Sequence, residues 1–563
     1  MRSSNGVRIP ARNQVKRWRH YTVVILFAGT CVALSARVIY LGSTERDFLQ
    51  EQGDARSVRV EKIPSHRGVV YDRHGEPLAV STPVVAVWTD PRRDALSDSQ
   101  LGQVANAVGA NAGELRAVLD AKHDRSFAYL KRQVSWAESE RLRALDIEGV
   151  HFINEYRRYY PGAETVAHVV GVTDVDDIGL EGIELAYDHV LKGSAGEKVV
   201  LRDRKGNNIR DLDYRSAPRF GSDIALSIDL RLQYLAYREL KAAIEGHEAS
   251  SGSIVMLDVN TGEILALANQ PSYNPNDVLD SARMRNRAVT DSYEPGSTVK
   301  PFTVLAALES GRFASDTLID TGPGYFNVGP KLIQDPVNRG IISLAEALKK
   351  SSQVGFARIA LNLEKQAVFG VFARAGFGDF VGAGLPGETP GTLRDEGLSR
   401  PLERVTLAYG YGLSVTPLQL ARAYLTIATG GIRLPVSIVR QNRVPDGERM
   451  FDAHLVIEVR EMLEGVTAPD GTAPGARVDG YRVGGKTGTA RKVGAGGYSD
   501  ERHVALFAGI APIDDPRVVM VVIINEPQRS LISGGAVAAP VFSRVAGRAL
   551  RLLGVPPSWS EAV

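Results

Sequence analysis

Cysteine is almost absent from this chain, in which Cys31 is the only one among 563 residues. A single cysteine cannot form an internal disulfide. Because Cys31 lies in an apolar N-terminal segment, the rest of the chain carries no thiol. This composition suits an oxidising compartment without requiring one.

The sequence also lacks an excess of charge of either sign. The formal net charge is +2, and no long basic tract follows the first twenty residues. We therefore expect no nucleic-acid partner. A hydrophobic fraction of 44% and a charged fraction of 23% are typical of globular proteins, and the length predicts two to four domains.

The N-terminus combines a basic tail with an apolar segment. Residues 1–20 contain arginine and lysine but no acid, and residues 21–41 are apolar except for Arg37 near the outer end. About 20 such residues span the hydrocarbon layer of a membrane. Because basic flanks stay in the cytoplasm, we predict a cytoplasmic tail at 1–20, a transmembrane anchor at 21–41 and an exported chain from residue 42.

Two alternatives compete with a membrane anchor at this apolar segment. Ala33-Leu34-Ser35, with small residues at its first and third positions, resembles the cleavage site of a signal peptide. The long basic region and the apolar residues after Arg37 favour an uncleaved anchor instead. A buried helix of a soluble protein is disfavoured because the segment has no polar face.

The exported chain changes character near residue 219. Residues 42–218 are polar and rich in charge, whereas the later part shows strand and helix patterns. We expect a pedestal domain at 42–218 and a second domain at 219–563. Predicted strands lie at 224–228, 253–258, 263–268, 504–510 and 518–524, and predicted helices at 230–245, 344–349, 416–430 and 540–553. Early and late strands with helices between them predict an α+β fold with an antiparallel sheet packed by helices.

Motifs in the polar part are interpreted as structural. Arg67 to Gly75 predicts a short strand and a tight turn, and Arg158 to Pro161 and Gly179 to Glu184 predict turn glycines and ion-paired arginines. A calcium loop around Asp174 is disfavoured because the glycine and terminal glutamate of an EF-hand are missing. We expect no metal site.

The sharpest local feature is the stretch around Ser297. Pro295 and Gly296 predict a turn, after which Ser297 begins a helix. A spacing of three places Ser297 and Lys300 on the same side of that helix, one turn apart. A serine hydroxyl needs a neighbouring base to become a nucleophile. Lysine can serve when burial or nearby positive charge favours its neutral form. Alone, this pattern is common, and an N-cap serine beside a surface lysine would explain it.

Two further motifs strengthen the interpretation of Ser297 as a nucleophile with a lysine base. Glycines flank Lys486, which allows close backbone approach to a ligand. Lys486 supplies positive charge, Thr487 and Thr489 supply hydroxyls, and exposed N–H groups of such a strand can stabilise an oxyanion. Between the motifs that contain Lys300 and Lys486, Ser351-Ser352-Gln353 follows the predicted helix at 344–349. It is the best candidate for a third motif of the catalytic site.

The ordered motifs resemble those of the penicillin-binding proteins, in particular the monofunctional class B branch. They are Ser297-x-x-Lys300, Ser351-x-Gln353 and Lys486-Thr487-Gly488-Thr489. The resemblance covers roughly residues 20 to 555. Its other signatures are Glu294–Lys300, Ala408–Thr416, Gly485–Arg491 and the three motifs of the polar part, which resemble the pedestal of division-specific members.

This resemblance implies a peptidoglycan D,D-transpeptidase that acts through a serine acyl-enzyme, without a cofactor. Ser297 would be the nucleophile, Lys300 its base, and Ser351 a proton relay. Lys486, Thr487, Gly488 and Thr489 would hold the substrate carboxylate, with the N–H groups of Ser297 and Thr489 as the oxyanion hole. Gln353 would contact the stem peptide.

The resemblance also implies location and partners. We expect a single-pass protein of the bacterial inner membrane with its bulk in the periplasm. Expected partners are lipid-linked pentapeptide and peptidoglycan, β-lactam antibiotics, a membrane-embedded cell-wall glycosyltransferase and divisome proteins. The sequence favours division over elongation only through the resemblance, and it leaves the chemistry of the cross-link acceptor open.

One departure keeps a second function open. The family's middle motif usually ends in asparagine, whereas position 353 is glutamine, which has the same amide groups on a stem one methylene longer. An impaired paralogue that binds β-lactams as a scaffold or sensor is therefore the main alternative. The anchor and the pedestal argue against a β-lactamase, and no carboxylate constellation indicates a second, glycosyltransferase activity.

Overall fold

The computed structural model describes residues 17–203, 208–277, 280–494, 497–529 and 531–558. These fall into two compact units. Unit 1 comprises the described residues up to Ser65 together with Ser194–Arg219, and unit 2 comprises His66–Gly193 and Phe220 onward. Most of the predicted cytoplasmic tail, residues 1–16, lies outside the described residues.

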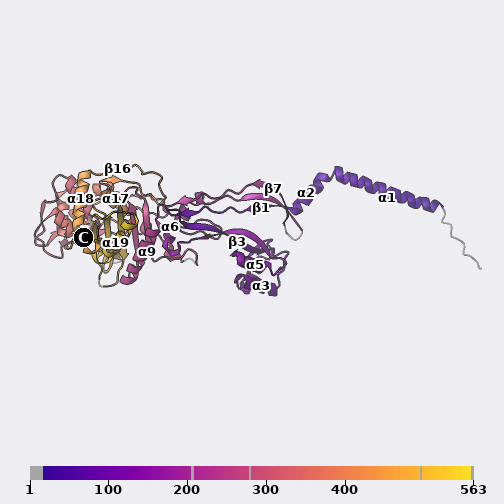
Figure 1. The fold of residues 1–563 in the computed structure, drawn as a ribbon, viewed down its shortest axis with the longest axis horizontal. Helices are drawn as coiled ribbons and strands as arrows, with labels where there is room; N and C mark the ends of the chain where they lie inside the picture. The colour runs from indigo at the N-terminus through magenta and orange to yellow at the C-terminus, as the bar shows by residue number, and fades with distance from the viewer. Residues whose placement is uncertain (1–16, 204–207, 278–279, 495–496, 530, 559–563) are drawn as a thin grey trace, which may run out of the picture. The chain divides into compact units, whose positions relative to one another are not determined.

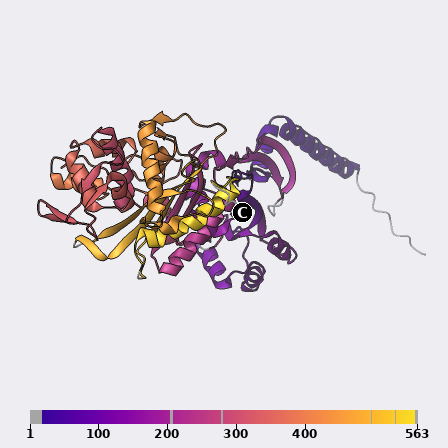
Figure 2. The same ribbon diagram turned by 60° about the vertical axis from the view of Figure 1, so that its left-hand side comes forward.

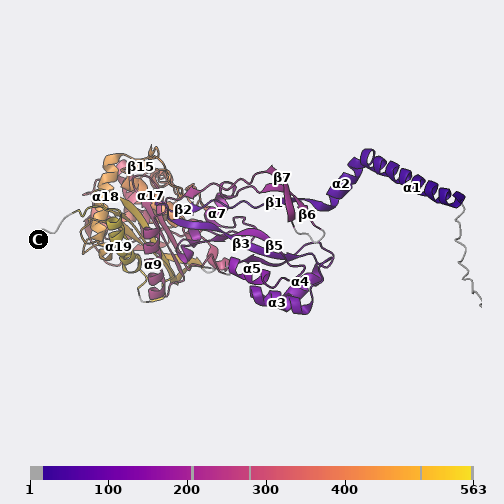
Figure 3. The same ribbon diagram turned by 45° about the vertical axis from the view of Figure 1, so that its right-hand side comes forward.

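Unit 1 contains the apolar N-terminal helix and a small sheet. Helix α1 (Arg17–Ser43) includes the predicted anchor, and none of its side chains is buried in the protein. Within the described part of the chain it is the one helix long and apolar enough to cross a membrane. Helix α2 (Arg46–Ser57) leads into an antiparallel three-stranded sheet. Its strands, visible in Figure 3, are β1 (Val58–Ile63), β6 (Gly196–Arg202) and β7 (Asn208–Ser216).

Unit 2 begins with a mixed sheet that helices cover. Its strands are β4 (Ala128–Val134), β3 (Pro77–Thr89), β2 (Val70–Tyr71) and β8 (Ile224–Ala225), with β5 (His151–Tyr159) also paired to β3. Helices α3 (Asp98–Val108), α4 (Ala112–Ala121) and α5 (Trp136–Arg143) pack beside β3 (Figure 3), and apolar residues of these helices and strands form one core. The predicted short strand and turn near Arg67 are confirmed as β2 and the turn that follows it.

The arginines of this part form a buried ion-pair network, as predicted. Arg67 Nε lies 2.5 Å and Arg158 Nε 2.6 Å from the carboxylate of Glu184, and Arg67 also contacts Asp188 at 2.6 Å. Glu184 is fully buried. A Cβ on Gly179 would lie 1.9 Å from the backbone oxygen of Glu184, so only glycine fits there.

The larger part of unit 2 is built on an antiparallel five-stranded sheet. In spatial order its strands are β10 (Ile264–Gln270), β9 (Ser251–Asp258), β19 (Val518–Asn525), β18 (Gly497–Ala511) and β17 (Gly484–Gly494). Side chains alternate between the faces of a strand, and here both faces are covered. Met520 and Val522 pack with α9 (Leu230–His247) and α19 (Gly534–Leu552), which lie side by side (Figure 1), whereas Val519 and Val521 face the opposite core.

Helices on that opposite side carry much of the chemistry discussed below. They are α12 (Lys300–Glu309), α13 (Leu344–Lys349), α14 (Gln353–Asn362), α15 (Ala367–Arg374), α16 (Pro401–Ala408), α17 (Pro417–Ala428) and α18 (Ala453–Thr467). In Figure 2 most of these helices, coloured red to orange, gather on one side of the domain. Thr416 caps α17 through a capping box, which explains why its start was predicted from sequence.

The remaining elements are short. They are the helices α6 (Ala167–Val170), α7 (Gly182–Ala186), α8 (Asp188–Leu191), α10 (Ser281–Met284) and α11 (Arg287–Thr290), and the strand pairs β11 (Leu318–Asp320) with β14 (Ile341–Ser343), β12 (Tyr325–Val328) with β13 (Lys331–Gln334), and β15 (Ile432–Arg433) with β16 (Glu448–Arg449).

Two predicted elements differ from the structure. The strand expected at 224–228 is only the two-residue β8. The last helix begins at Gly534, six residues before the predicted start at Pro540, because Ser533 caps it and Pro540 lies inside the helix. The predicted hairpin, α13 and the late strands are confirmed, and the α+β fold is confirmed.

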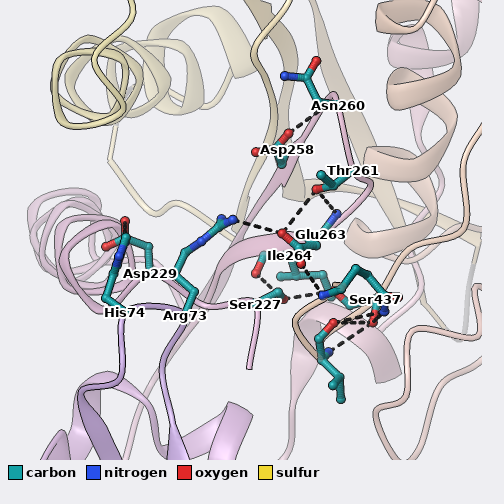
Figure 4. Close-up of polar contacts among 12 residues, drawn as sticks. Arg73, His74, Ser227, Asp229, Asp258, Asn260, Thr261, Glu263, Ile264 and Ser437 are labelled. Carbon is teal, nitrogen blue, oxygen red and sulfur yellow. Dashed lines mark hydrogen bonds and ion pairs between the residues drawn. The ribbon is translucent and has the colours of Figure 1, made fainter. Parts of the chain in front are cut away.

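Unit 2 joins its N-terminal sheet to the five-stranded sheet through a polar junction (Figure 4). Arg73 Nη2 lies 3.0 Å from the buried carboxylate of Glu263, which also accepts a 2.6 Å hydrogen bond from the backbone of Gln441. His74 contacts Asp229, the N-cap of α9, at 3.1 Å. Both carboxylates are buried, and each contacts a side chain of the turn that carries Arg73 and His74. These contacts hold the turn against the part of unit 2 that is built on the five-stranded sheet.

Candidate active site

Ser297 lies on a tight turn that leads directly into a buried helix. Residues Gly296–Val299 form a 3₁₀ helix, η2, and α12 begins at Lys300. The predicted helix start is confirmed, with a tighter first turn. Residues three apart are eclipsed in a 3₁₀ helix, so Ser297 and Lys300 face the same side. The backbone N–H of Gly296, which has φ 52°, donates to Gly410 O at 3.1 Å.

Lys300 is fully buried and contacts the second predicted motif. Its Nζ donates to the backbone oxygen of Ser351 at 2.8 Å and to the hydroxyl of Ser351 at 3.1 Å. It also lies 5.0 Å from the centroid of the Phe356 ring. The structure therefore brings Lys300 and Ser351 together, as the resemblance implies.

Burial gives Lys300 the properties of a base. Desolvation lowers its pKa to about 7, and the charge of Asp335 opposes this effect. Of the two causes that can favour a neutral lysine, burial and nearby positive charge, burial is the one that lowers the pKa of Lys300. The charge effect is seen on Lys486, whose pKa is lowered well below its usual value by burial and by the charge of Lys300.

Lys486 is buried on the edge strand β17. Its Nζ donates to the hydroxyl of Thr487 at 3.2 Å, and that hydroxyl donates to the hydroxyl of Thr472 at 3.2 Å. A carboxylate that approaches this strand would favour the charged form of Lys486. Lys486 and Thr487 of β17 and the neighbouring Thr472 thus form a connected row of one amine and two hydroxyls.

Close packing of β17 against η2 explains the glycine between the two threonines. A Cβ on Gly488 would lie 2.8 Å from both Pro295 O and the Cγ2 atom of Thr298. Contacts this short do not occur, so the strand can approach the serine turn only with glycine at this position. Thr489 is fixed from the other side, where Gly534 N donates to its hydroxyl at 3.1 Å.

The middle motif adopts an unusual backbone. Ser351 has φ 59°, in the left-handed region that side chains other than glycine rarely adopt. Such strain persists when neighbours hold it in place. Ser352 caps α14, and the side chain of Gln353 is exposed at the first position of this helix.

Asp335 is a residue that the sequence interpretation missed. Its carboxylate is buried and accepts hydrogen bonds from the hydroxyl of Ser352, from Gln353 N at 2.5 Å and from Val354 N at 3.2 Å. Asp335 thereby anchors the turn that presents Ser351 to Lys300. No local pattern marks it, because its partners lie 17 or more residues further along the chain.

Glu294 is a second missed residue. Its Oε1 atom accepts hydrogen bonds from Gly412 N and from the hydroxyl of Tyr498, each at 3.0 Å. Burial raises the pKa of this carboxyl. Glu294 therefore ties the turn before Ser297 to two other segments of the chain.

The spacing Gly480-x₄-Gly485-Lys486-Thr487 also matches a phosphate-binding loop. Such a loop must open a helix. Here Gly485 and Lys486 lie in β17, where both pair with β18, and Gly480 lies in a turn before that strand, so this interpretation is excluded. In the described part of the chain, no group of three or more His, Cys, Asp or Glu side chains is placed to hold a metal.

Known protein families match both parts of the chain. Residues 252–547 match the penicillin-binding protein transpeptidase domain, and residues 62–226 match the penicillin-binding protein dimerisation domain. The fold and the family model together define the C-terminal part as a penicillin-binding transpeptidase domain. The chain belongs to the class B penicillin-binding proteins, which confirms the family that the motifs resemble.

Similarity to individual proteins extends over nearly the whole chain. Peptidoglycan D,D-transpeptidase FtsI of Escherichia coli is 42% identical over 531 residues, covering 93% of this chain and 90% of that protein. Probable peptidoglycan D,D-transpeptidase PenA of Neisseria meningitidis is 41% identical over 542 residues, covering 95% and 92%. Probable peptidoglycan D,D-transpeptidase PbpC of Pseudomonas aeruginosa is 38% identical, covering 97% of each chain.

Solved structures show the same relationship. The transpeptidase domain of Burkholderia pseudomallei penicillin-binding protein 3 is 42% identical, with a TM-score of 0.55 over 60% of this chain and 98% of that one. Penicillin-binding protein 3 of Mycobacterium tuberculosis, complexed with aztreonam, is 26% identical, with a TM-score of 0.69 over 89% of this chain and 98% of that one.

Proposed function

We propose that this chain is a peptidoglycan D,D-transpeptidase that works through an acyl ester on Ser297 and is inhibited by β-lactams. One observation carries the proposal. A fully buried lysine, Lys300, lies one helical turn after Ser297 and contacts Ser351 at 3.1 Å, beside a strand that carries Lys486. The names of its relatives and its transpeptidase domain support the same activity.

The first half of the reaction forms the acyl-enzyme. The Oγ atom of Ser297 attacks the carbonyl carbon between the two terminal D-alanines of a stem peptide, while neutral Lys300 takes its proton. The peptide C–N bond then breaks. Ser351 relays the proton to the departing nitrogen, and D-alanine leaves. The backbone N–H groups of Ser297 and Thr489 stabilise the oxyanion.

Other groups position the substrate. Lys486, Thr487 and Thr489 bind the terminal carboxylate, and Gly488 keeps their strand close to the serine turn. The amide of Gln353 contacts the backbone of the stem. In the second half, the amine of another stem attacks the ester carbon, a C–N bond forms, and the amine proton returns to the Oγ atom of Ser297 as the ester bond breaks.

The domain roles and the orientation are part of the proposal. Residues 1–20 form the cytoplasmic tail, 21–41 the anchor, 42–218 the pedestal and 219–563 the transpeptidase domain, which lies in the periplasm. The basic tail before an apolar helix supports this orientation. We propose a role at the division septum, with a membrane-embedded glycosyltransferase and divisome proteins as partners.

Turnover of a model substrate tests the activity. A purified chain is supplied with a thioester that mimics D-Ala-D-Ala and with D-alanine as acceptor, and both hydrolysis and transfer are followed. The expected result is transfer by the wild type, none by Ser297→Ala, and normal transfer by Ser292→Ala, an exposed serine five residues earlier. Acylation without any transfer or hydrolysis would contradict the proposal and would indicate a β-lactam-binding scaffold.

A further inference from the structure

The loop at 468–473 contacts two motifs of the candidate active site. It joins α18 to η3 (Pro474–Ala476), a 3₁₀ helix that precedes β17. Asp470 of this loop contacts the residues directly before Ser351, and Thr472 contacts Thr487. The roles proposed above leave this loop without a function.

Asp470 fastens the loop to the middle motif. The Nζ atoms of Lys349 and Lys350 lie 2.7 Å and 3.1 Å from the Oδ2 atom of Asp470. Lys350 also donates to the backbone oxygen of Asp470 at 2.6 Å. Because Lys350 directly precedes Ser351, these contacts tie the loop to the turn that contacts Lys300.

Close packing fixes the backbone around Thr472. A Cβ on Gly471 would lie 2.2 Å from Val466 O in α18, and a Cβ on Gly535 in α19 would lie 2.3 Å from Thr472 O. Contacts this short do not occur, so only glycine fits at either position. Thr472 is therefore held between the end of α18 and the start of α19.

Thr472 presents its hydroxyl to Thr487. Thr487 donates to the hydroxyl of Thr472 at 3.2 Å, and Lys486 Nζ donates to the hydroxyl of Thr487 at 3.2 Å. A hydroxyl has one proton to donate and can accept as well. A carboxylate only accepts, so Thr487 must give it this proton. Thr472 can then reverse its role and donate its own proton to Thr487.

We infer that Thr472 is a positioning residue for the substrate carboxylate, and that the ion pairs of Asp470 hold it at a fixed distance from the middle motif. The inference rests on the proposed transpeptidase function. Thr472 acts through Thr487: by donating to the oxygen of that hydroxyl, it keeps the hydroxyl proton of Thr487 directed at the terminal carboxylate of the donor peptide. No covalent bond forms or breaks at Thr472.

Donors with and without a terminal carboxylate test this inference. Acylation of the full chain is measured with a thioester that ends in a carboxylate and with the same thioester ending in a carboxamide. Thr472→Val keeps the size of the side chain but removes the hydroxyl. We expect it to lose about threefold to tenfold in acylation by the carboxylate donor, as expected for one hydrogen bond, with the carboxamide donor unchanged. Thr472→Ser keeps the hydroxyl and should acylate at the wild-type rate with both donors.

Asp470→Asn tests the ion pairs. The side chain of Asp470 is 60% exposed, so its pairs with the two lysines are weakened by solvent. We therefore expect a smaller loss of about twofold to fivefold, again with the carboxylate donor alone. Asp446→Asn, at an exposed acid in the loop between β15 and β16, is the matched control and should change neither rate.

The outcomes separate this inference from the function itself. Equal losses for both donors in Thr472→Val, no loss for either, or a loss of the same size in Thr472→Ser would overturn the role of Thr472. Unchanged acylation in Asp470→Asn would overturn the role of its ion pairs. A wild type that neither donor acylates would instead overturn the proposed function.

Discussion

The Nζ atom of Lys300 lies 3.1 Å from the hydroxyl oxygen of Ser351 and 2.8 Å from the backbone oxygen of the same residue. These two contacts join the helix that follows Ser297 to the left-handed turn before α14. The lysine is thereby held in a site from which water is excluded, where its neutral form is favoured.

Acylation should depend on pH through Lys300. Because the pKa of Lys300 is lowered to about 7, the base is protonated below this pH and neutral above it. The rate of acylation by penicillin should therefore rise with pH through about 7 and then level off. Stopped-flow measurement between pH 5.5 and 9 checks this, and a flat profile would contradict the role of Lys300 as base.

Replacing Asp335 should change both the rate and the profile. The substitution Asp335→Asn keeps the size of the side chain but removes the charge that raises the pKa of Lys300. We expect the midpoint of the pH profile to move to lower pH. We also expect acylation to slow by about tenfold, since charge-assisted hydrogen bonds that hold the Ser351 turn are weakened.

Thermal unfolding of Asp335→Asn separates the two effects. If Asp335→Asn lowers the thermal stability but leaves the midpoint of the pH profile of acylation unchanged, Asp335 acts on the backbone alone. Asp320→Asn, at an exposed acid on β11, is the matched control. It should leave both the midpoint of the pH profile and the rate of acylation unchanged.

The approach of β17 to the serine turn depends on Gly488. Gly488→Ala would place a Cβ 2.8 Å from Pro295 O, and overpacking of this kind costs about 1–3 kcal/mol. We expect the strand to move away from Ser297 and acylation to fall by at least about tenfold. Gly370→Ala in α15, where nothing lies within 4 Å of the added Cβ, should keep full activity.

The buried network around Glu184 should be essential for stability. Glu184→Gln leaves the guanidinium groups of Arg67 and Arg158 buried without their shared carboxylate, which typically costs about 3–5 kcal/mol. Glu140→Gln removes only an exposed pair with Arg143 and should cost less than about 1 kcal/mol. Chemical denaturation followed by circular dichroism compares the two. Equal stabilities would show that the network contributes little.

Local signals explain what could be predicted from the sequence. The hairpin of β9 and β10 follows from Asn260-Thr261-Gly262, and α17 follows from its cap at Thr416 and the proline after it. The three-residue spacing of Ser297 and Lys300 predicted that the two residues lie on the same side of their helix. Each of these features is set by residues within one or two turns of one another.

Features that depend on distant residues were missed. Asp335 and Glu294 gain their roles from partners that meet them only in the folded chain, and Asp335 carries no local pattern. The sequence also left open whether burial or nearby positive charge would lower the pKa of Lys300. It shows two lysines but not how deeply Lys300 is buried, and burial is the cause that lowers this pKa.

The position of the acyl group tests the central claim most directly. The purified chain is treated with a fluorescent penicillin and digested, and the labelled peptide is identified by mass spectrometry. The account predicts a single acylated residue, Ser297, and no label on Ser297→Ala. An acyl group on any other residue, Ser351 included, would contradict it.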